Sequence, residues 1–243
     1  MNEIFSVIMP VFNSEKTVSD SINSILAQTY SDFKLYIIND SSTDTSKDII
    51  LSFNDERIVY LETSENSGVA YARNLGIRNC TGIYISFLDS DDLWLPNKLE
   101  YQLAKLQTGY DVVCSNYFTF NNESDFTLRK SPTIITYSSM LKSNFIGNLT
   151  GTYNANSIGK IFQKKIGHED YVMWLEILQK SGKAFCIQEP LAKYRISNNS
   201  LSSNKLKAIK WQWSIYRNEL KLSIPKSLYC FSHYLLNALK KRR

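Results

Sequence analysis

The sequence has few of the features that mark secreted, disulfide-linked or membrane-spanning proteins. Its four cysteines are far apart and form no CxxC pair, so we expect reduced, buried thiols of a cytosolic protein rather than a disulfide framework or a metal site. The first residues include an acid and no basic segment, which predicts no secretory signal. The uncharged stretch at 227–239 is shorter than the roughly 18 apolar residues of a membrane span.

Positive charge is scarce in the first half of the chain and concentrated in the second. Residues 1–120 contain 8 Lys and Arg against 16 Asp and Glu, whereas residues 121–243 contain 20 against 7. From Lys193 onward, 12 basic residues accompany the single acid Glu219. Such a segment suits an anionic partner, namely phosphates, nucleic acid or an acidic membrane surface, although a solvated basic face has the same composition.

Strand-like and helix-like segments alternate through the first half. Buried-strand patterns occupy residues 4–9, 33–39, 57–63, 82–88 and 111–120, and apolar residues at helical spacing lie between them. With 43% hydrophobic residues in 243, the chain is long enough for one large domain, or one domain with an appendage. The alternation predicts an α/β protein with a mostly parallel sheet covered by helices on both faces, which binds its ligand beyond the carboxyl ends of the strands.

The fourth predicted strand ends in three carboxylates, Asp89, Asp91 and Asp92. Crowded like charges are tolerable when a divalent cation joins them, and Mg²⁺ or Mn²⁺ takes carboxylate oxygens together with substrate phosphates. The D-x-D spacing is therefore a candidate metal–diphosphate site. The alternative is a helix cap with solvated neighbours, and we expect Asp92 to cap the helix that follows.

Several motifs in order resemble glycosyltransferase family 2, the inverting enzymes with a GT-A nucleotide-sugar-binding fold. They are "SVIMPVFNSEKTVSDSINSILAQTYSDFKLYIINDSSTDTS", "NSGVAYARNLGI" and "GIYISFLDSDDLWLPNKLE", and the likeness resumes at "GHEDYVMWLEIL" and "KYRISNNSLS". The resemblance implies a GT-A (Rossmann-like) sheet flanked by helices. We expect a nucleotide-sugar-binding half at 1–120, an acceptor-binding and catalytic-base half at 121–202, and a basic amphipathic helical extension at 203–243.

The resemblance implies a nucleotide site at the ends of the first strands. Pro10, Val11 and Asn13 of the "PVFN" turn would pack under the nucleobase. Asp40 would accept a hydrogen bond from the uracil ring, and Arg73 would lie near the base.

A diphosphate and metal site is implied beside it. Gly68 lets backbone approach the ligand closely, Asp89 would contact ribose hydroxyls, and Asp91 would be the ligand of Mn²⁺ or Mg²⁺. Arg195 would bind the diphosphate, or form only a surface salt bridge. Family members often place a histidine two residues after this arginine; Ser197 stands there instead, so water or a serine hydroxyl would complete the metal shell.

The "HED" segment resembles the family motif that carries the catalytic base. We expect Asp170 to take the proton from the acceptor hydroxyl and Glu169 to position the acceptor or the base. The alternative is structural, because acids in the first turn of a helix are favourable with its dipole.

Two basic helical segments complete the chain. Residues 204–222 interleave cations with Trp211, Trp213 and Tyr216. Residues 226–243 place one apolar face on a helix that ends in four cations; this face consists of Leu228, Phe231, Leu235 and Leu239. Such helices are typical of a membrane interface, although packing on the catalytic domain or binding of single-stranded nucleic acid is also compatible. We expect packing for the first helix and membrane contact for the second.

The resemblance thus implies a metal-dependent inverting hexosyltransferase. It would move glucose or galactose from a UDP-sugar to a polyprenyl-diphosphate-linked N-acetylhexosamine in bacterial O-antigen or capsular repeat-unit synthesis, as a peripheral protein at the cytoplasmic face of the inner membrane. A nucleotidyltransferase on a related fold is a weaker alternative, because "PVFNSEKTV" lacks the expected glycine-rich loop. The third hypothesis is a non-catalytic module that binds carbohydrate or nucleic acid.

Overall fold

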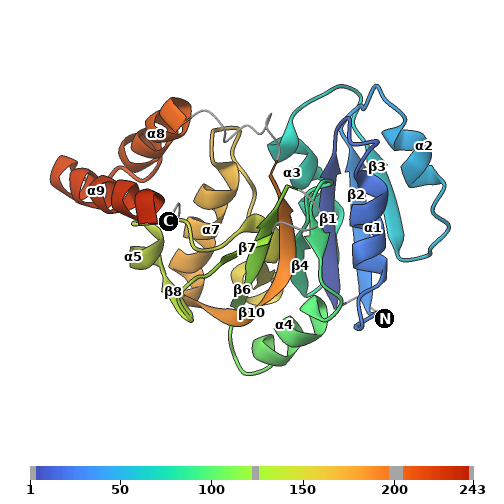
Figure 1. Ribbon diagram of the computed structural model, residues 1–243, viewed down its shortest axis with the longest axis horizontal. Coiled ribbons are helices and arrows are strands. Elements are labelled where there is room, and N and C mark those ends of the chain that lie inside the picture. The colour runs from blue at the N-terminus through green and yellow to red at the C-terminus, as the bar shows by residue number, and fades with distance from the viewer. Residues whose placement is uncertain (1–3, 122–125, 197–204, 241–243) are drawn as a thin grey trace.

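A mixed β-sheet forms the centre of the molecule, with helices on both faces (Figure 1). The computed structural model describes residues 4–121, 126–196 and 205–240. Within these residues the sheet has ten strands in the order β3-β2-β1-β4-β9-β6-β10-β5, with β7 paired to β6 and β8 paired to β10. The predicted α/β class is confirmed.

The first four main strands are parallel, as the sequence pattern predicts. They are β1 (Phe5–Val11), β2 (Phe33–Asn39), β3 (Ile58–Glu62) and β4 (Tyr84–Phe87). Every residue of β1 is buried, because helices cover both faces of this part of the sheet. Their carboxyl ends meet at one edge, where Asn13 follows β1, Asp40 follows β2 and the three acids follow β4.

The sheet becomes mixed beyond β4. A short strand, β9 (Thr152–Asn154), lies antiparallel between β4 and β6 (Val112–Phe120), and β6 is parallel to β10 (Lys183–Arg195). The remaining antiparallel strands are β5 (Leu93–Trp94), β7 (Phe126–Arg129) and β8 (Ile134–Thr136). Strand β10 brings Arg195 back to the edge where β4 ends.

Helices on the two faces bury separate halves of the core. One face is covered by α1 (Val18–Leu26), α2 (Ser46–Leu51) and α4 (Lys98–Leu106). The other is covered by α3 (Val69–Asn79), α6 (Ala155–Ile158) and α7 (Glu169–Ser181), with α5 (Tyr137–Met140) at its margin. Leu149 of the 3₁₀ turn η1 (Asn148–Thr150) packs in the first half.

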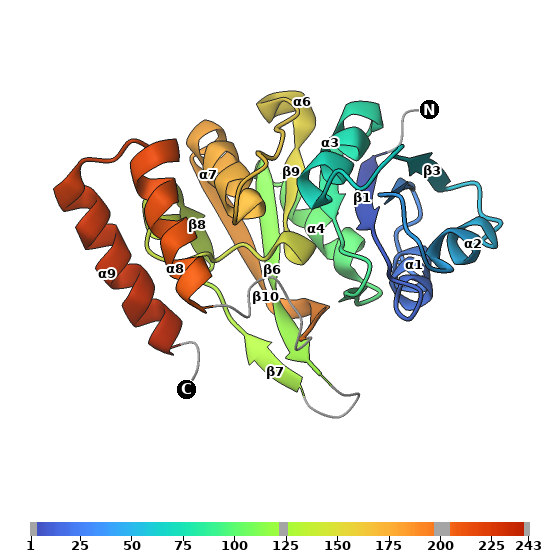
Figure 2. The same ribbon diagram turned by 90° about the horizontal axis from the view of Figure 1, so that it is seen from above.

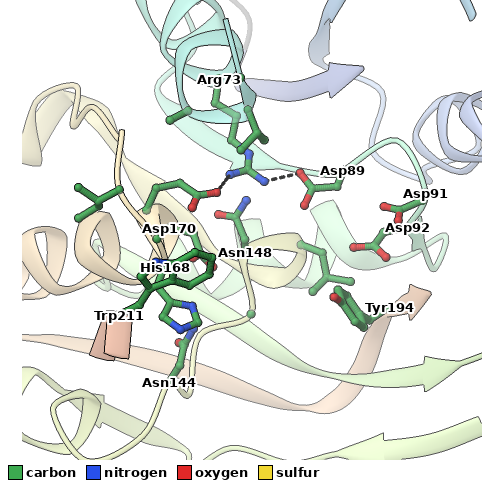
Figure 3. Close-up of a pocket in the computed structure, with 18 of the residues that line it drawn as sticks. Arg73, Asp89, Asp91, Asp92, Asn144, Asn148, His168, Asp170, Tyr194 and Trp211 are labelled. Atoms are coloured by element: carbon green, nitrogen blue, oxygen red, sulfur yellow. Dashed lines mark hydrogen bonds and ion pairs between the residues drawn. The ribbon is translucent and has the colours of Figure 1, made fainter. Parts of the chain in front are cut away.

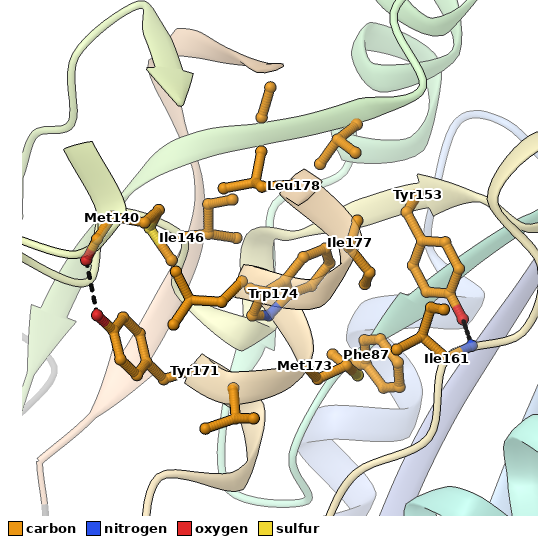
Figure 4. Packing of buried hydrophobic residues seen from close by; sticks show 14 of the residues in the cluster. Phe87, Met140, Ile146, Tyr153, Ile161, Tyr171, Met173, Trp174, Ile177 and Leu178 are labelled. Atoms are coloured by element: carbon orange, nitrogen blue, oxygen red, sulfur yellow. Dashed lines mark hydrogen bonds between the residues drawn. The ribbon is translucent and has the colours of Figure 1, made fainter. Parts of the chain in front are cut away.

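Trp174 is the centre of the second core (Figure 4). Its ring meets those of Phe87 and Tyr153 edge-on, with ring centroids 6.2 and 6.1 Å apart. Only glycine fits at position 151, because a Cβ there would lie 2.2 Å from the Trp174 ring. This packing fixes α7 against β4 and β9, and removal of the ring would cost about 3–5 kcal/mol.

The C-terminal segment packs beside α7 at one end of the molecule. It consists of α8 (Lys205–Ser214), a π-helical turn (Ile215–Glu219) and α9 (Ile224–Lys240). Figure 2 shows α8 and α9 side by side and running in opposite directions. Ile215 and Tyr216 are buried in the second core, and the Tyr216 hydroxyl donates to the Leu141 carbonyl, so the expected packing of the first segment is present.

Helix α9 has one face against the protein and one apolar stripe facing outward. Ser227 and Cys230 are buried, and Phe231 meets the Trp213 ring edge-on at 5.4 Å. The exposed stripe consists of Ile224, Leu228, Tyr229 and Leu236. No helix in the described part of the chain is long and apolar enough to cross a membrane.

Candidate active site

Two cavities meet beyond the carboxyl ends of the parallel strands. The first cavity, of about 840 Å³, is lined by the ends of β1 and β2. The second cavity, of about 920 Å³, extends toward α7 and α8. Their shared wall consists of Gly68, Val69, Asp89, Asp91 and Arg195. The acids that follow β4 therefore face both compartments.

The first cavity contains the "PVFN" turn that sequence analysis placed under a nucleobase. Pro10, Val11 and Asn13 all line it. Asn13 has a left-handed φ of 48°, and its Oδ1 accepts a hydrogen bond of 2.8 Å from the Thr43 amide. This bond ties the end of β1 to the loop after β2 and shapes the cavity floor.

Asp40 is buried at the inner end of the first cavity. Its carboxylate accepts hydrogen bonds from the Thr63 hydroxyl at 2.8 Å, from the Ser67 amide at 3.1 Å and from the Gly68 amide at 2.8 Å. Gly68, at a φ of 92°, is the residue before α3. A carboxylate has about four acceptor sites, so about one remains for a ligand donor such as a pyrimidine N–H. The predicted contact stays a prediction.

Asp92 does not cap a helix, so this prediction is wrong. Strand β5 and a turn separate it from α4, whose N-cap is Asn97. Asp92 is instead buried, and its Oδ1 accepts a 2.8 Å hydrogen bond from the Arg195 amide. Burial and the neighbouring charges of Asp91 and Asp89 raise its pKa well above the ordinary value. This hydrogen bond connects the end of β10 to the acidic turn after β4.

Asp91 lies open to both cavities and has an unfavourable local charge balance. Burial and the charge of Asp89 raise its pKa, despite Arg195 and Arg73 nearby. The Arg195 guanidinium is held by the Asp91 carbonyl, which accepts from Nε at 2.9 Å, and it lies 4.7 Å from the Phe120 ring centroid. Arg195 is thus fixed at the junction of the cavities. The place of Ser197 lies outside the described residues.

These acids fit a divalent cation that is shared with substrate phosphates. In the part of the chain that the structure describes, no three His, Cys, Asp or Glu side chains are grouped to hold a metal unaided. Mg²⁺ and Mn²⁺ sites commonly use one or two carboxylates and complete their coordination with phosphate and water. Asp91, with Asp89 beside it, supplies such a carboxylate at the wall between the cavities.

Arg73 connects the acidic turn after β4 to the start of α7 (Figure 3). Its Nη2 lies 2.6 Å from Asp89 Oδ1, and its Nη1 lies 3.1 Å from Glu169 Oε1 and 3.0 Å from Gln163 Oε1. Burial opposes the positive charge, but Asp89 and Glu169 outweigh it and raise the pKa of the guanidinium. Arg73 lines the second cavity rather than the one that contains Asp40. Its predicted contact with the base stays a prediction.

Asp170 lines the second cavity at the first turn of α7. His168, at a left-handed φ of 59°, precedes the helix, and Glu169 is turned toward Arg73. The Asp170 carboxyl is therefore left facing the cavity, opposite the acids after β4 (Figure 3). Burial and the charge of Glu169 raise its pKa. A carboxylate with a raised pKa and an open cavity in front of it is suited to general-base chemistry.

The far end of the second cavity consists of residues to which the sequence assigned no role. Lys165, Gly167 and His168 form one side, and Lys207 and Trp211 of α8 form the other. The Trp211 ring packs on Gly167, where a Cβ would lie 2.1 Å from the ring, and meets His168 edge-on at 5.4 Å. The sequence signal was the interleaving of Trp211 with cations, from which we expected a helix packed on the catalytic domain but not a cavity wall.

Asn148 of η1 lies in the same cavity. Its Oδ1 accepts a 3.3 Å hydrogen bond from the Trp174 indole N–H, which can only donate and therefore fixes the orientation of the amide. Among the described residues its buried Nδ2 has no hydrogen-bond partner.

The fold and these paired cavities have the architecture of the GT-A glycosyltransferases. The sequence model of "Glycosyl transferase family 2" matches residues 6–163. The chain belongs to glycosyltransferase family 2.

Curated relatives extend the similarity over almost the whole chain. The "Putative teichuronic acid biosynthesis glycosyltransferase TuaG" of Bacillus subtilis is 38% identical, covering 98% of this chain and 97% of its own length. The "UDP-Glc:alpha-D-GlcNAc-diphosphoundecaprenol beta-1,3-glucosyltransferase WfgD" of Escherichia coli is 35% identical, covering 98% and 94%.

Solved structures confirm the fold. TarS of S. aureus in complex with UDP-GlcNAc aligns with a TM-score of 0.74 at 18% identity, over 96% of this chain and 71% of that one. The mannosyltransferase PcManGT of Pyrobaculum calidifontis in complex with GDP-Man and Mn²⁺ aligns with a TM-score of 0.69 at 14% identity, over 99% and 76%.

Proposed function

We propose that the protein transfers a hexose, glucose or galactose, from a UDP-sugar to a hydroxyl of a polyprenyl-diphosphate-linked N-acetylhexosamine, with inversion at the transferred carbon. The observation that carries this proposal is the junction of two cavities at Asp89, Asp91 and Arg195, with Asp170 facing them across the second cavity. One compartment suits the nucleotide and the other suits the acceptor.

The first cavity would hold the nucleoside. The "PVFN" turn offers an apolar floor, and Asp40 keeps an acceptor site for a base N–H. The donor diphosphate would then lie at the shared wall, where Asp91 would hold Mn²⁺ or Mg²⁺ and Arg195 would add a positive charge. When bound, such a cation stabilises the negative charge that builds on the departing UDP.

Asp170 would act as the base. As the acceptor oxygen bonds to the anomeric carbon, its proton passes to the Asp170 carboxylate, and the bond from that carbon to the UDP oxygen breaks. One base on the face opposite the leaving group gives inversion, and a raised pKa brings the carboxylate closer to the proton affinity the task requires. Glu169, held by Arg73, would keep the first turn of α7 in register with the acidic turn.

The relatives support the choice of donor and acceptor. WfgD and WfaP of Escherichia coli, 35% and 33% identical to this chain, are both named as transferring glucose from UDP-Glc to GlcNAc-diphosphoundecaprenol. We place the reaction at the cytoplasmic face of a bacterial inner membrane in O-antigen-type synthesis. The exposed apolar stripe of α9, followed by the cations of the C-terminus, would rest on the anionic lipid surface.

The test is donor hydrolysis by the purified protein. A panel of nucleotide sugars would be incubated with Mn²⁺, with Mg²⁺ and with EDTA, for the wild type and for Asp91→Ala, with Asp48→Ala as the control because this acid is exposed on α2. We expect UDP release from one UDP-hexose, dependent on metal and lost only in Asp91→Ala. Failure of every nucleotide sugar to bind or react contradicts a transferase, and release of diphosphate from a nucleoside triphosphate would favour nucleotidyl transfer.

A further inference from the structure

We infer that the far end of the second cavity is a subsite for the diphosphate of the acceptor, formed by Lys165 and Lys207 beside Trp211. This assignment rests on the proposed function, because it names how the second substrate is held. All three residues lie outside the region that the family model matches.

The charges of the second cavity differ between its two ends. The end near β4 contains Asp89, Asp91 and Asp92, with Arg73 paired to Asp89 and Arg195 bound to the Asp91 carbonyl. Asp170 lies on the side of His168 and Trp211 (Figure 3). The far end is lined by Lys165 and Lys207, both of which are exposed residues. Trp211 and Asp91 lie on opposite sides of the cavity in Figure 3. An acceptor that is a neutral sugar at one end and a dianion at the other matches this division.

The two lysines are placed for this task by specific contacts of their neighbours. Lys164 is directed away from the cavity by an ion pair with Glu219 at 2.6 Å, and the next residue, Lys165, lines the cavity. Lys207 lies over the Trp211 ring, with Nζ 4.9 Å from the centroid, and Trp211 is fixed by its contact with Gly167. The two lysines thus line the cavity from two separate segments, the loop before α7 and helix α8.

The position of the subsite also suits a lipid-linked substrate. Lys207 and Trp211 belong to α8, and α8 packs against α9, which carries the outward apolar stripe (Figure 2). An acceptor with its sugar at Asp170 and its diphosphate at Lys207 would direct its lipid toward the side of the molecule where α9 lies. Soluble acceptors that lack an anion would gain nothing from this end of the cavity.

The experiment compares two acceptors that differ only in the diphosphate. One is an alkyl diphosphate glycoside of N-acetylglucosamine, and the other is the alkyl glycoside without phosphate, both in neutral detergent micelles. Steady-state constants for donor and acceptor would be measured for the wild type, Lys165→Gln, Lys207→Gln and the double variant. Lys210→Gln is the matched control, because Lys210 is exposed on the same helix but does not line the cavity.

We expect each cavity variant to raise the acceptor KM about tenfold for the diphosphate acceptor alone, as loss of a charged hydrogen bond predicts. The donor KM should stay within about twofold, which separates the acceptor diphosphate from that of UDP. Equal KM values for both acceptors in the wild type, or an equal effect of Lys210→Gln, would overturn the subsite. If the protein hydrolyses the donor but neither lysine variant changes the acceptor KM, only this inference is contradicted. If the protein hydrolyses no donor, the proposed function is contradicted and the subsite with it.

Discussion

Arg73 and Asp89 form an ion pair of 2.6 Å between Nη2 and Oδ1, in which the arginine side chain is 5% exposed and the aspartate side chain 35%. The same guanidinium also binds Glu169. The acidic turn after β4 and the first turn of α7 are therefore held at a set distance by a single cation. Asp89 is neutralised by this contact and Asp91 is not, which separates the roles of the two acids of the D-x-D motif.

Arg73→Ala should lower both stability and catalysis, because it leaves Asp89 and Glu169 without their counter-charge. We expect a loss of about 2–4 kcal/mol in the free energy of unfolding, reduced from the value for fully buried pairs because Asp89 is partly exposed. Arg73→Lys should recover part of the stability but not kcat, since lysine lacks the planar fork that reaches three partners. Chemical denaturation and kinetics measure both, with exposed Arg78→Ala as the control. Full activity in Arg73→Lys would contradict the positioning role.

Asp170→Asn should lower kcat by about 10²–10⁴-fold with little change in donor KM, if Asp170 is the general base. The same variant should be more stable than the wild type at neutral pH. The folded-state pKa of Asp170 is raised above its ordinary 3.8, so the wild type loses stability as the pH rises through that pKa. Below pH 3.8 the difference between the two proteins should vanish.

Unfolding free energies across a pH series, together with the pH dependence of kcat/KM, test this prediction. The apparent pKa of the acid limb of the kcat/KM profile should be higher than the ordinary pKa of an aspartate side chain. Exposed Asp20→Asn is the control and should leave both profiles unchanged. A variant that retains wild-type kcat would remove Asp170 from the mechanism.

Lys98→Met should stabilise the protein. Lys98 is completely buried, its Nζ donates to Gln102 Oε1 at 2.8 Å, and it lies 3.7 Å from the Trp94 ring centroid. Burial lowers its pKa well below 10.5, so the wild type gains stability as the pH rises toward that value. In the variant, Gln102 Oε1 keeps the Thr152 hydroxyl as its donor at 2.7 Å.

Thermal and urea unfolding at pH 6 to 10 would measure the effect. The stabilisation should be largest at the lowest pH and decrease toward pH 10. Lys210→Met is the control, because Lys210 is exposed on α8, and it should leave the unfolding free energy nearly unchanged at every pH. Destabilisation of Lys98→Met at every pH would show that the ammonium contacts outweigh the cost of its burial.

Leu228→Asp and Leu236→Asp should weaken binding to lipid vesicles without unfolding the protein. Both leucines are 55% exposed on the outward stripe of α9. The double variant should reduce vesicle partitioning at least about tenfold, as loss of two partly inserted leucines predicts. Sedimentation with anionic and with neutral vesicles measures this, and Leu51→Asp, also 55% exposed but on α2, is the control. Equal vesicle partitioning of the wild type, the double variant and Leu51→Asp would contradict a membrane role for α9.

The parallel half of the fold was predictable because its strands are buried on both faces and read as continuous apolar runs between helical segments. Strand β9 gave no such signal. It is three residues long, and its Thr152 is buried against Ser86 through a 2.6 Å hydroxyl hydrogen bond rather than through apolar packing. Period-based patterns do not detect a strand whose burial depends on a polar pair from 66 residues away.

The acids of the site were predictable because each lies in a short motif at a strand end or a helix start. Asp92 shows the limit, since local sequence favours a cap while its actual partner is the amide of Arg195, far along the chain. Lys165 and Trp211 were not recognised for the same reason. Their common cavity depends on how α8 packs on the segment before α7, and no local pattern encodes that contact.

The contact between Gly167 and Trp211 bears on how such enzymes diversify. A tryptophan at position 211 requires glycine at position 167, because any side chain there would collide with the indole ring. Exchange of the C-terminal helices between relatives, intended to alter acceptor choice, must therefore carry both positions as a linked pair. A chimera that joins one parent's residue 167 to another parent's helix would misplace the loop that leads directly into Asp170.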